Sequence, residues 1–169
     1  MALITMVEPE DATGEVADIF NEMEKFLGHI PEAQKLYAVS PGFLQATVAN
    51  IRRLMTHPRF SKSSMLAWVR FLIARETQCA YCIDFNQWLL LNRHNFTLDQ
   101  LETAKREPSQ TPLPEDELAL LTVILKVVAD SNSLTAEDIS HLKELGWNEA
   151  DIFEAISHAT SMVGIDMLL

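Results

Sequence analysis

The sequence predicts an all-α fold, a single-domain bundle of eight or nine helices, and three observations support this prediction. Only five of the 169 residues are glycine, against a usual share of about 7%, whereas hairpin-rich folds need glycine in turns with positive φ. No sustained alternation of apolar and polar residues indicates a strand. Apolar residues instead recur every three or four positions along most of the chain, as they do in helices that bury one face.

The N-terminal third predicts three helices. In 12–27 an apolar face lies opposite an acidic one, and Gly28 is the kind of residue that ends a helix. Shorter helices are expected over 33–39 and 43–55, and a proline follows each of them within a few residues.

The middle of the chain predicts three more helices. Serines in 61–64 are suitable N-cap residues for a helix that begins near Met65. A second helix is expected over 81–92. Thr97 and Gln100 have the spacing of a capping box, in which each side chain bonds the other residue's backbone N–H, and this predicts a third helix start.

The C-terminal part begins with 107–114, which holds three prolines and is expected to be a loop. A strongly apolar helix follows over 115–130. Thr135 opens the next helix and Gly146 ends it. The last helix is expected over 149–167, with its apolar residues turned inward.

Composition excludes several classes of protein. Thirteen basic and 24 acidic residues give a net charge of −11, which argues against a nucleic-acid partner. An apolar share of 48% is too high for a disordered chain. Two cysteines are too few for a disulfide scaffold or a four-cysteine zinc site. The length favours one domain over 1–169.

Targeting and membrane signals are not evident. The first basic residue is Lys25, whereas a secretory signal needs a basic start. No apolar run approaches the roughly 20 residues that span a bilayer. We therefore expect a cytoplasmic protein without a membrane partner, in a compartment that keeps thiols reduced.

Charge is unevenly distributed along the chain. The segment 33–75 contains seven basic residues and no acidic one. One interpretation is that acidic and basic segments face each other, within a subunit or between subunits. The other is that the basic segment raises the positive potential next to the cysteines that follow it.

The constellation that could carry chemistry is Cys79-Ala80-Tyr81-Cys82. Two cysteines at this spacing can meet where a loop turns into a helix, and the free N–H groups there stabilise a thiolate and lower the thiol pKa. The second thiol can then attack a sulfenic acid or mixed disulfide formed on the first. This cycle needs no cofactor and no metal.

Two other interpretations of the cysteine pair remain open. It could be half of a zinc site, although there is no second cysteine pair and the five histidines show no close spacing. The cysteines could also be inert buried side chains, which is a common fate of this residue.

The sequence resembles the alkylhydroperoxidase D-like, carboxymuconolactone decarboxylase superfamily, and specifically its peroxidase-related members. The similarity runs from about Pro9 to the C-terminus and is carried by PEDATGEVADIFNEMEKFLGHIP, SPGFLQA and AWVRFLIARETQ followed by CAYC. It implies an alkylhydroperoxidase D-like helical fold that assembles into a homo-oligomer, a hexamer or alternatively a trimer. It also implies a CxxC pair in which Cys82 attacks the peroxide and Cys79 resolves the product.

The proton relay of the resembled superfamily is missing here. Its pattern places a glutamate twelve residues before the first cysteine and a histidine four residues after the second, where this chain has Ala67 and Asn86. Asn86 can hydrogen-bond a thiol or a water but does not titrate. Glu76, three residues before Cys79, is the expected substitute base.

Other side chains near the pair in sequence are expected to have ordinary roles. His57 and His94 are more typical of surface or capping histidines than of relay residues. Tyr81, Trp68 and Trp88 are expected to pack in the core or at a subunit contact rather than to bind substrate.

The functional expectation is a thiol-dependent antioxidant protein, a peroxidase or disulfide reductase that takes a peroxide or disulfide substrate and a thiol reductant protein. Its site residues are Cys82, Cys79, Glu76 and Asn86. One alternative is a non-catalytic redox-sensing or scaffold protein of the same fold. Another is a lyase acting on a cyclic lactone acid, although that reaction does not require a cysteine pair.

The first testable prediction concerns assembly. Many large apolar residues on several helices of a short chain are expected to be buried between subunits. Light scattering at micromolar concentration should therefore give the mass of a homo-oligomer, with a hexamer favoured over a trimer. A mass of one chain at that concentration would contradict the prediction.

Overall fold

The computed structural model describes residues 4–169, and these form nine α-helices and four short 3-10 helices without any strand. The predicted all-α class and helix number are therefore confirmed. The chain divides into two compact units, one ending at Ser61 and the other spanning Lys62–Leu169, and each is described separately. The expectation of one domain over 1–169 stays a prediction.

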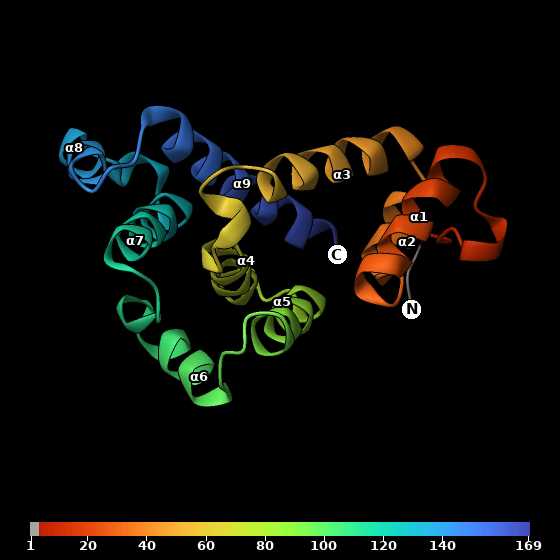
Figure 1. Cartoon of the computed structure of the whole chain (residues 1–169), viewed down its shortest axis with the longest axis horizontal. Coiled ribbons are helices and arrows are strands. Elements are labelled where there is room, and N and C mark those ends of the chain that lie inside the picture. Colours follow the sequence, from red (N-terminus) through yellow and green to blue (C-terminus); the bar gives the residue numbers. More distant parts are fainter. Residues whose placement is uncertain (1–3) are drawn as a thin grey trace. The chain divides into compact units, whose positions relative to one another are not determined.

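The first unit contains a 3-10 turn and three helices (Figure 1): η1 at Pro9–Asp11, α1 at Gly14–Leu27, α2 at Glu32–Tyr37 and α3 at Pro41–Met55. Both α1 and α2 contact α3. Ile19 and Phe20 of α1 are buried, as are Leu44 and Val48 of α3. The apolar face predicted for the first helix is thus buried in the first half of α1, whereas Phe26, expected on the same face near the end of the helix, is 59% exposed.

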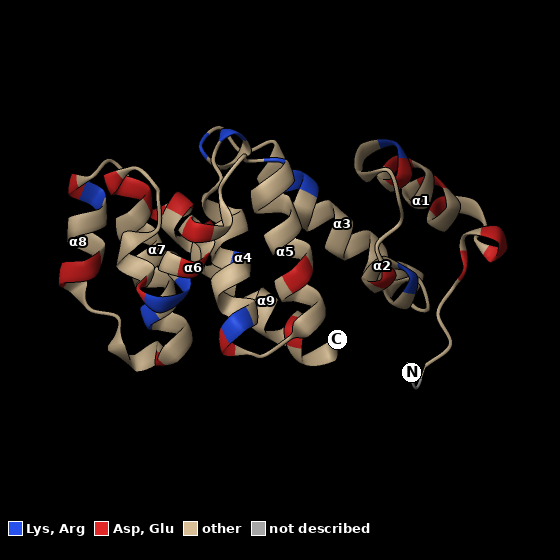
Figure 2. Cartoon of the chain, turned by 90° about the horizontal axis from the view of Figure 1, so that it is seen from below, with Lys and Arg blue, Asp and Glu red and all other residues tan. Residues whose placement is uncertain are grey.

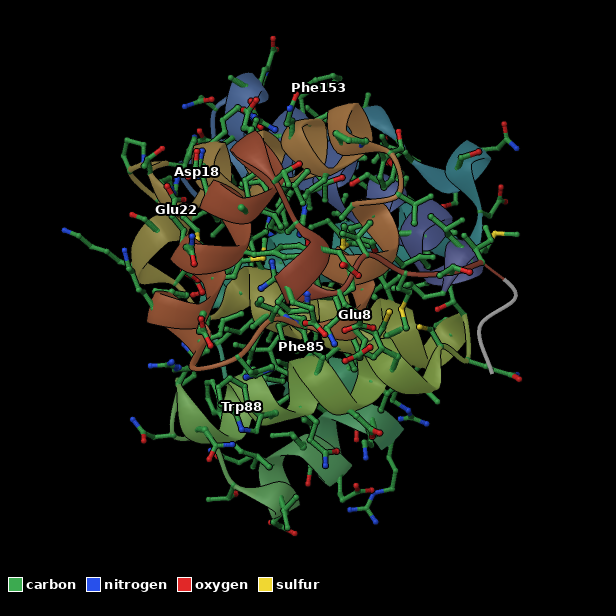
Figure 3. The ribbon with its side chains drawn as sticks, turned by 90° about the vertical axis from the view of Figure 1, so that its right-hand side faces the viewer. Glu8, Asp18, Glu22, Phe85, Trp88 and Phe153 are labelled. Carbon is green, nitrogen blue, oxygen red and sulfur yellow. The ribbon has the colours of Figure 1, made fainter. Side chains whose placement is uncertain are left out.

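Opposite charges meet within this first unit. Acidic residues line α1, where Asp18 and Glu22 project from the helix, and basic residues occupy one end of α3 (Figures 2 and 3). Arg52 of α3 pairs with Glu22, and Lys35 of α2 pairs with Glu8 at 3.1 Å. The interpretation that acidic and basic segments face each other holds for these pairs. Exposed pairs of this kind orient helices more than they stabilise them.

The second unit contains six α-helices and the 3-10 turns η3 and η4. The α-helices are α4 at Met65–Glu76, α5 at Ala80–Asn92, α6 at Leu98–Arg106, α7 at Glu115–Ala129, α8 at Ala136–Glu144 and α9 at Glu149–Leu168. The 3-10 turn η2 at Phe60–Lys62 crosses the boundary between the units. The expected loop 107–114 contains η3 at Pro108–Gln110. No helix among residues 4–169 has both the length and the apolar character needed to cross a membrane.

Helix α4 is the centre of the second unit. Nine of its 12 residues are buried, and it packs against α5, α7 and α9 (Figure 1). A helix that is apolar on all sides is stable only when other elements surround it. Helices α5, α7 and α9 therefore all pack on α4, and this packing brings the ends of α4 and α9 to the start of α5.

The helix starts follow the predicted capping chemistry. Ser63 accepts a hydrogen bond from the Met65 N–H at 2.9 Å. The capping box between Thr97 and Gln100 is present at the start of α6. A second one forms at the start of α8, where Thr135 pairs with an aspartate rather than a glutamate. These caps explain why the predicted starts are correct to within a residue or two.

A matched pair of glycine substitutions in the first unit tests how α1 ends. Gly28 has φ of +84° in the left-handed region, whereas Gly42 lies inside α3, and a Cβ added at either would meet no atom within 4 Å. Gly28→Ala should lower the free energy of unfolding by about 1 kcal/mol because a side chain disfavours left-handed backbone. Gly42→Ala should raise it by up to about 0.5 kcal/mol. Urea unfolding measures both, and an unchanged or stabilised Gly28→Ala would contradict the assignment.

Candidate active site

The site is built by a tight turn between α4 and α5. Helix α4 ends at Glu76, and Gln78 then takes φ of 59°, a left-handed conformation that is uncommon for a residue other than glycine. The N–H of Cys79 donates to the carbonyl of Ala74 at 3.0 Å, which closes the turn. The chain thus reverses within three residues, and α5 begins with Cys79 as its N-cap.

The two cysteines lie together at this helix start. Sγ of Cys79 accepts a hydrogen bond from the N–H of Cys82 at 3.3 Å, so the sulfur itself caps α5. Both are free cysteines and each is 7% exposed. The predicted position at a loop-to-helix junction is confirmed, and the positive end of the helix dipole acts on the sulfur of Cys79.

A carboxylate that the sequence analysis did not select completes the cluster. Asp166 of α9 is 8% exposed, and one of its carboxylate oxygens and the two cysteine sulfurs all lie within 4.8 Å of one another. Its Oδ2 accepts a hydrogen bond from Oγ1 of Thr77 at 2.7 Å. The sequence contains one signal for the burial of Asp166, which is its helical register. Asp166 follows the buried Ala159 by seven residues, or two helical turns, and so lies on the inward face of α9.

The surroundings of Cys82 raise the pKa of its thiol, first through burial and then through Cys79 and Asp166. The position at a helix N-terminus predicts instead that the thiol pKa is lowered. The difference has a physical reason: the helix N–H is directed at the sulfur of Cys79, while Cys82 is buried beside a carboxylate. Cys82 is therefore held as a neutral thiol at neutral pH.

The side chain of Asn86 links the first turns of α5 to α4, and its hydrogen bonds go to a carbonyl and a guanidinium rather than to a cysteine sulfur. Its Nδ2 donates to the carbonyl of Cys82 at 2.8 Å, and its Oδ1 accepts from Nε of Arg70 at 3.1 Å. Nη1 of Arg70 also lies 3.4 Å from Nε2 of the buried His158 on α9. Burial lowers the pKa of Arg70 to about 10, so the guanidinium stays charged at neutral pH.

Glu76, the substitute base expected from sequence, is not brought to the sulfurs. Its side chain is exposed at the end of α4 and makes no hydrogen bond or ion pair within residues 4–169. The expectation assumed that the α4 helix would continue to Cys79, whereas it stops at Glu76 and the chain turns. Ala67 is buried inside α4 and supplies no titratable group.

The structure gives the surroundings of the other aromatic and histidine residues near the pair in sequence, and the expectation that they do not bind substrate stays a prediction. Trp68 is fully buried. Tyr81 stacks on Phe85 with ring centroids 6.2 Å apart, and Phe85 and Trp88 both lie on α5 (Figure 3). Nδ1 of His57 accepts from the N–H of Arg59 two residues away. His94 is exposed on the turn after α5.

Thiolates and carboxylates are also metal ligands. In the described part of the chain, Cys79, Cys82 and Asp166 are the group whose ligand atoms are close enough to hold an ion. The set has three donors and no histidine, whereas structural zinc sites use four protein ligands. A zinc ion held here would therefore need a ligand from outside the group.

Comparison with solved structures identifies the fold. A peroxidase-related protein from Silicibacter sp. TM1040 superposes with a TM-score of 0.82 at 18% identity, over 99% of this chain and 86% of that one. A second, described as an alkylhydroperoxidase AhpD core and peroxidase-related protein from Ralstonia eutropha JMP134, gives a TM-score of 0.83 at 18% identity, over 98% and 86%. The fold is that of the alkylhydroperoxidase D core.

The fold implied by the sequence resemblance is therefore confirmed. Both of these proteins are described as uncharacterized, so the comparison supports the fold and gives no measured activity. No protein-family model matches the sequence, and no curated protein matches it.

The raised pKa of Cys82 is testable in a Cys79→Ser variant, where Cys82 is the remaining cysteine. We expect the rate of alkylation by iodoacetamide to keep rising above pH 9, because burial delays ionisation of the thiol. The same variant in denaturant should show an inflection near the ordinary value of about 8.5. Limited access scales the rate without moving the inflection, so an inflection below 8.5 in the folded protein would contradict the assignment.

Proposed function

We propose that the chain is a thiol-dependent antioxidant protein that reduces peroxides through the Cys79–Cys82 pair. The observation that carries the proposal is the meeting of two free thiols and a carboxylate, all buried and within 4.8 Å, at the start of α5. A structural pair of cysteines needs no carboxylate beside it, because a buried acidic group costs free energy that a purely apolar cluster avoids.

The chemistry proceeds in two steps. The sulfur of Cys82 attacks the terminal oxygen of a hydroperoxide, so that an S–O bond forms and the O–O bond breaks. The sulfur is oxidised to a sulfenic acid, and the peroxide is reduced to an alcohol or water. The sulfur of Cys79 then attacks the sulfenic sulfur, and the disulfide forms as water leaves. The short distance between the sulfurs makes the second step intramolecular.

A reductant must close the cycle, because the pair leaves each turnover as a disulfide. A dithiol on another protein would attack one sulfur, release the other as a thiol and become oxidised itself. The same exchange run against an external disulfide gives the disulfide reductase activity. We include in this proposal a cytoplasmic location and a homo-oligomeric assembly, with a hexamer favoured.

Redox sensing without rapid turnover is the second candidate, and one observation favours it. The pKa of Cys82 is raised, and neither Ala67 nor Asn86 offers the proton relay of the resembled pattern. A sensor would form the same disulfide but would consume peroxide slowly. The two candidates therefore differ in rate, not in product.

The proposal predicts that peroxide converts both thiols into one disulfide. After one equivalent of hydrogen peroxide the parent protein should lose both alkylatable thiols and regain them with a dithiol, as intact mass measures. Cys82→Ser should lose this response, and Cys79→Ser should stop at a sulfenic acid that a dimedone-type probe captures.

Turnover separates the two candidates. Peroxide consumption with a dithiol reductant should exceed the rate of the free dithiol if the chain is an enzyme. A disulfide that forms without such turnover supports the sensor. Two thiols that stay alkylatable after peroxide exclude both.

A further inference from the structure

We propose that Asp166 is the proton carrier of the cysteine pair, with Thr77 as the residue that positions it. The inference rests on the proposed function and adds to it a catalytic group that comes from α9 rather than from the helices on either side of the pair. It rests on three features of the structure: the reach of the carboxylate, its burial, and the hydroxyl that holds it.

The reach of Asp166 covers both reacting atoms. One carboxylate oxygen lies within 4.8 Å of the sulfur of Cys79 and of the sulfur of Cys82. The pair needs proton transfer twice in each cycle, once when Cys82 attacks the peroxide and once when Cys79 attacks the sulfenic acid. A single group in reach of both sulfurs can serve both steps.

Burial makes this carboxylate suited to proton transfer. Asp166 is 8% exposed, and both sulfurs are 7% exposed. Within residues 4–169 Asp166 forms no ion pair, and its side-chain partners are neutral groups, the hydroxyl of Thr77 and the thiol of Cys82. A neighbouring cation would oppose proton transfer to a carboxylate, and the groups beside Asp166 in this cluster are two thiols and a hydroxyl.

Thr77 can satisfy Asp166 in both protonation states. Its Oγ1 lies 2.7 Å from Oδ2 of Asp166, 3.1 Å from the carbonyl of Ile73 and 3.2 Å from the carbonyl of Ala74. A hydroxyl has one hydrogen and rotates to suit its partners. When Asp166 is charged, Thr77 donates to it; when Asp166 is protonated, Thr77 accepts from it and donates to a carbonyl of α4 instead.

The first step transfers the proton of the Cys82 thiol to the leaving oxygen by way of Asp166. As the sulfur of Cys82 bonds to the terminal peroxide oxygen, its proton passes to Asp166. The O–O bond breaks, and the leaving oxygen takes the proton from Asp166 and departs as an alcohol or water. In the second step the proton of the Cys79 thiol goes the same way to the leaving hydroxide. A thiol that stays neutral until attack can react by this route, because no free thiolate need accumulate.

The test compares two reactions of the same sulfur. In Asp166→Asn, peroxide consumption at pH 7.5 should fall by about 100-fold or more, which is the usual scale of acid–base help. Alkylation of Cys82 by iodoacetamide should be as fast as in the parent or faster, because a negative charge beside the thiol is gone. A merely structural role of Asp166 would slow both reactions or neither.

Asp84→Asn is the matched control. Asp84 lies on α5 two residues after Cys82, is exposed, and makes no hydrogen bond or ion pair within residues 4–169. Asp84→Asn removes one negative charge by the same substitution as Asp166→Asn, and its peroxide consumption should stay within about twofold of the parent. Glu76→Gln is measured beside it as the competing base: a large loss in Glu76→Gln together with an unchanged Asp166→Asn would overturn the proposal.

A second pair of variants keeps the proposal falsifiable if Asp166→Asn does not fold. Thr77→Ser retains the hydroxyl and should stay near the parent rate, whereas Thr77→Val should lose about tenfold, the effect of one hydrogen bond to a charged group. Equal rates in the two Thr77 variants would overturn the proposal. If Cys82→Ser abolishes peroxide consumption while Asp166→Asn does not reduce it, Asp166 is not the proton carrier and the proposed function stands. If the parent protein shows no turnover, the proposal that the chain is an enzyme is refuted, and the role of Asp166 with it.

Discussion

The turn between α4 and α5 is the constraint on which the site depends. The buried helix α4 ends close to the N-terminus of α5, and the turn between them contains one left-handed residue, Gln78. Within that turn Thr77 bonds the carboxylate of Asp166 and Cys79 caps α5. The backbone geometry that ends α4 therefore also brings the two sulfurs and the carboxylate together.

The burial of α4 explains why a distant aspartate reaches this turn. Because α4 is apolar on nearly all sides, α9 packs along it, and the end of α9 meets the turn. Arg70, His158 and Asn86 form a second polar contact between the same helices. Polar groups buried this way are tolerated because they have partners, and their partners fix the register of α5 and α9 on α4.

Much of this arrangement could be predicted from the sequence, and the part that could not has a common cause. Helix starts and ends follow from local chemistry, as at Gly28 and at the Thr97 capping box, and the position of Cys79 at a helix start is local too. Glu76 was selected by extending a helix past its end. Asp166 was missed because its neighbours are set by helix packing, which sequence spacing does not encode.

The raised pKa of Cys82 has a consequence for damage as well as for rate. Irreversible oxidation of cysteine to sulfinic and sulfonic acids follows thiolate character and exposure, and Cys82 is 7% exposed and held neutral. A sulfenic acid formed there also has a second thiol within 4.8 Å to trap it. Under the proposed function, the site would therefore exchange speed for durability, because an oxidant pulse would leave the pair as a disulfide that a reductant can restore.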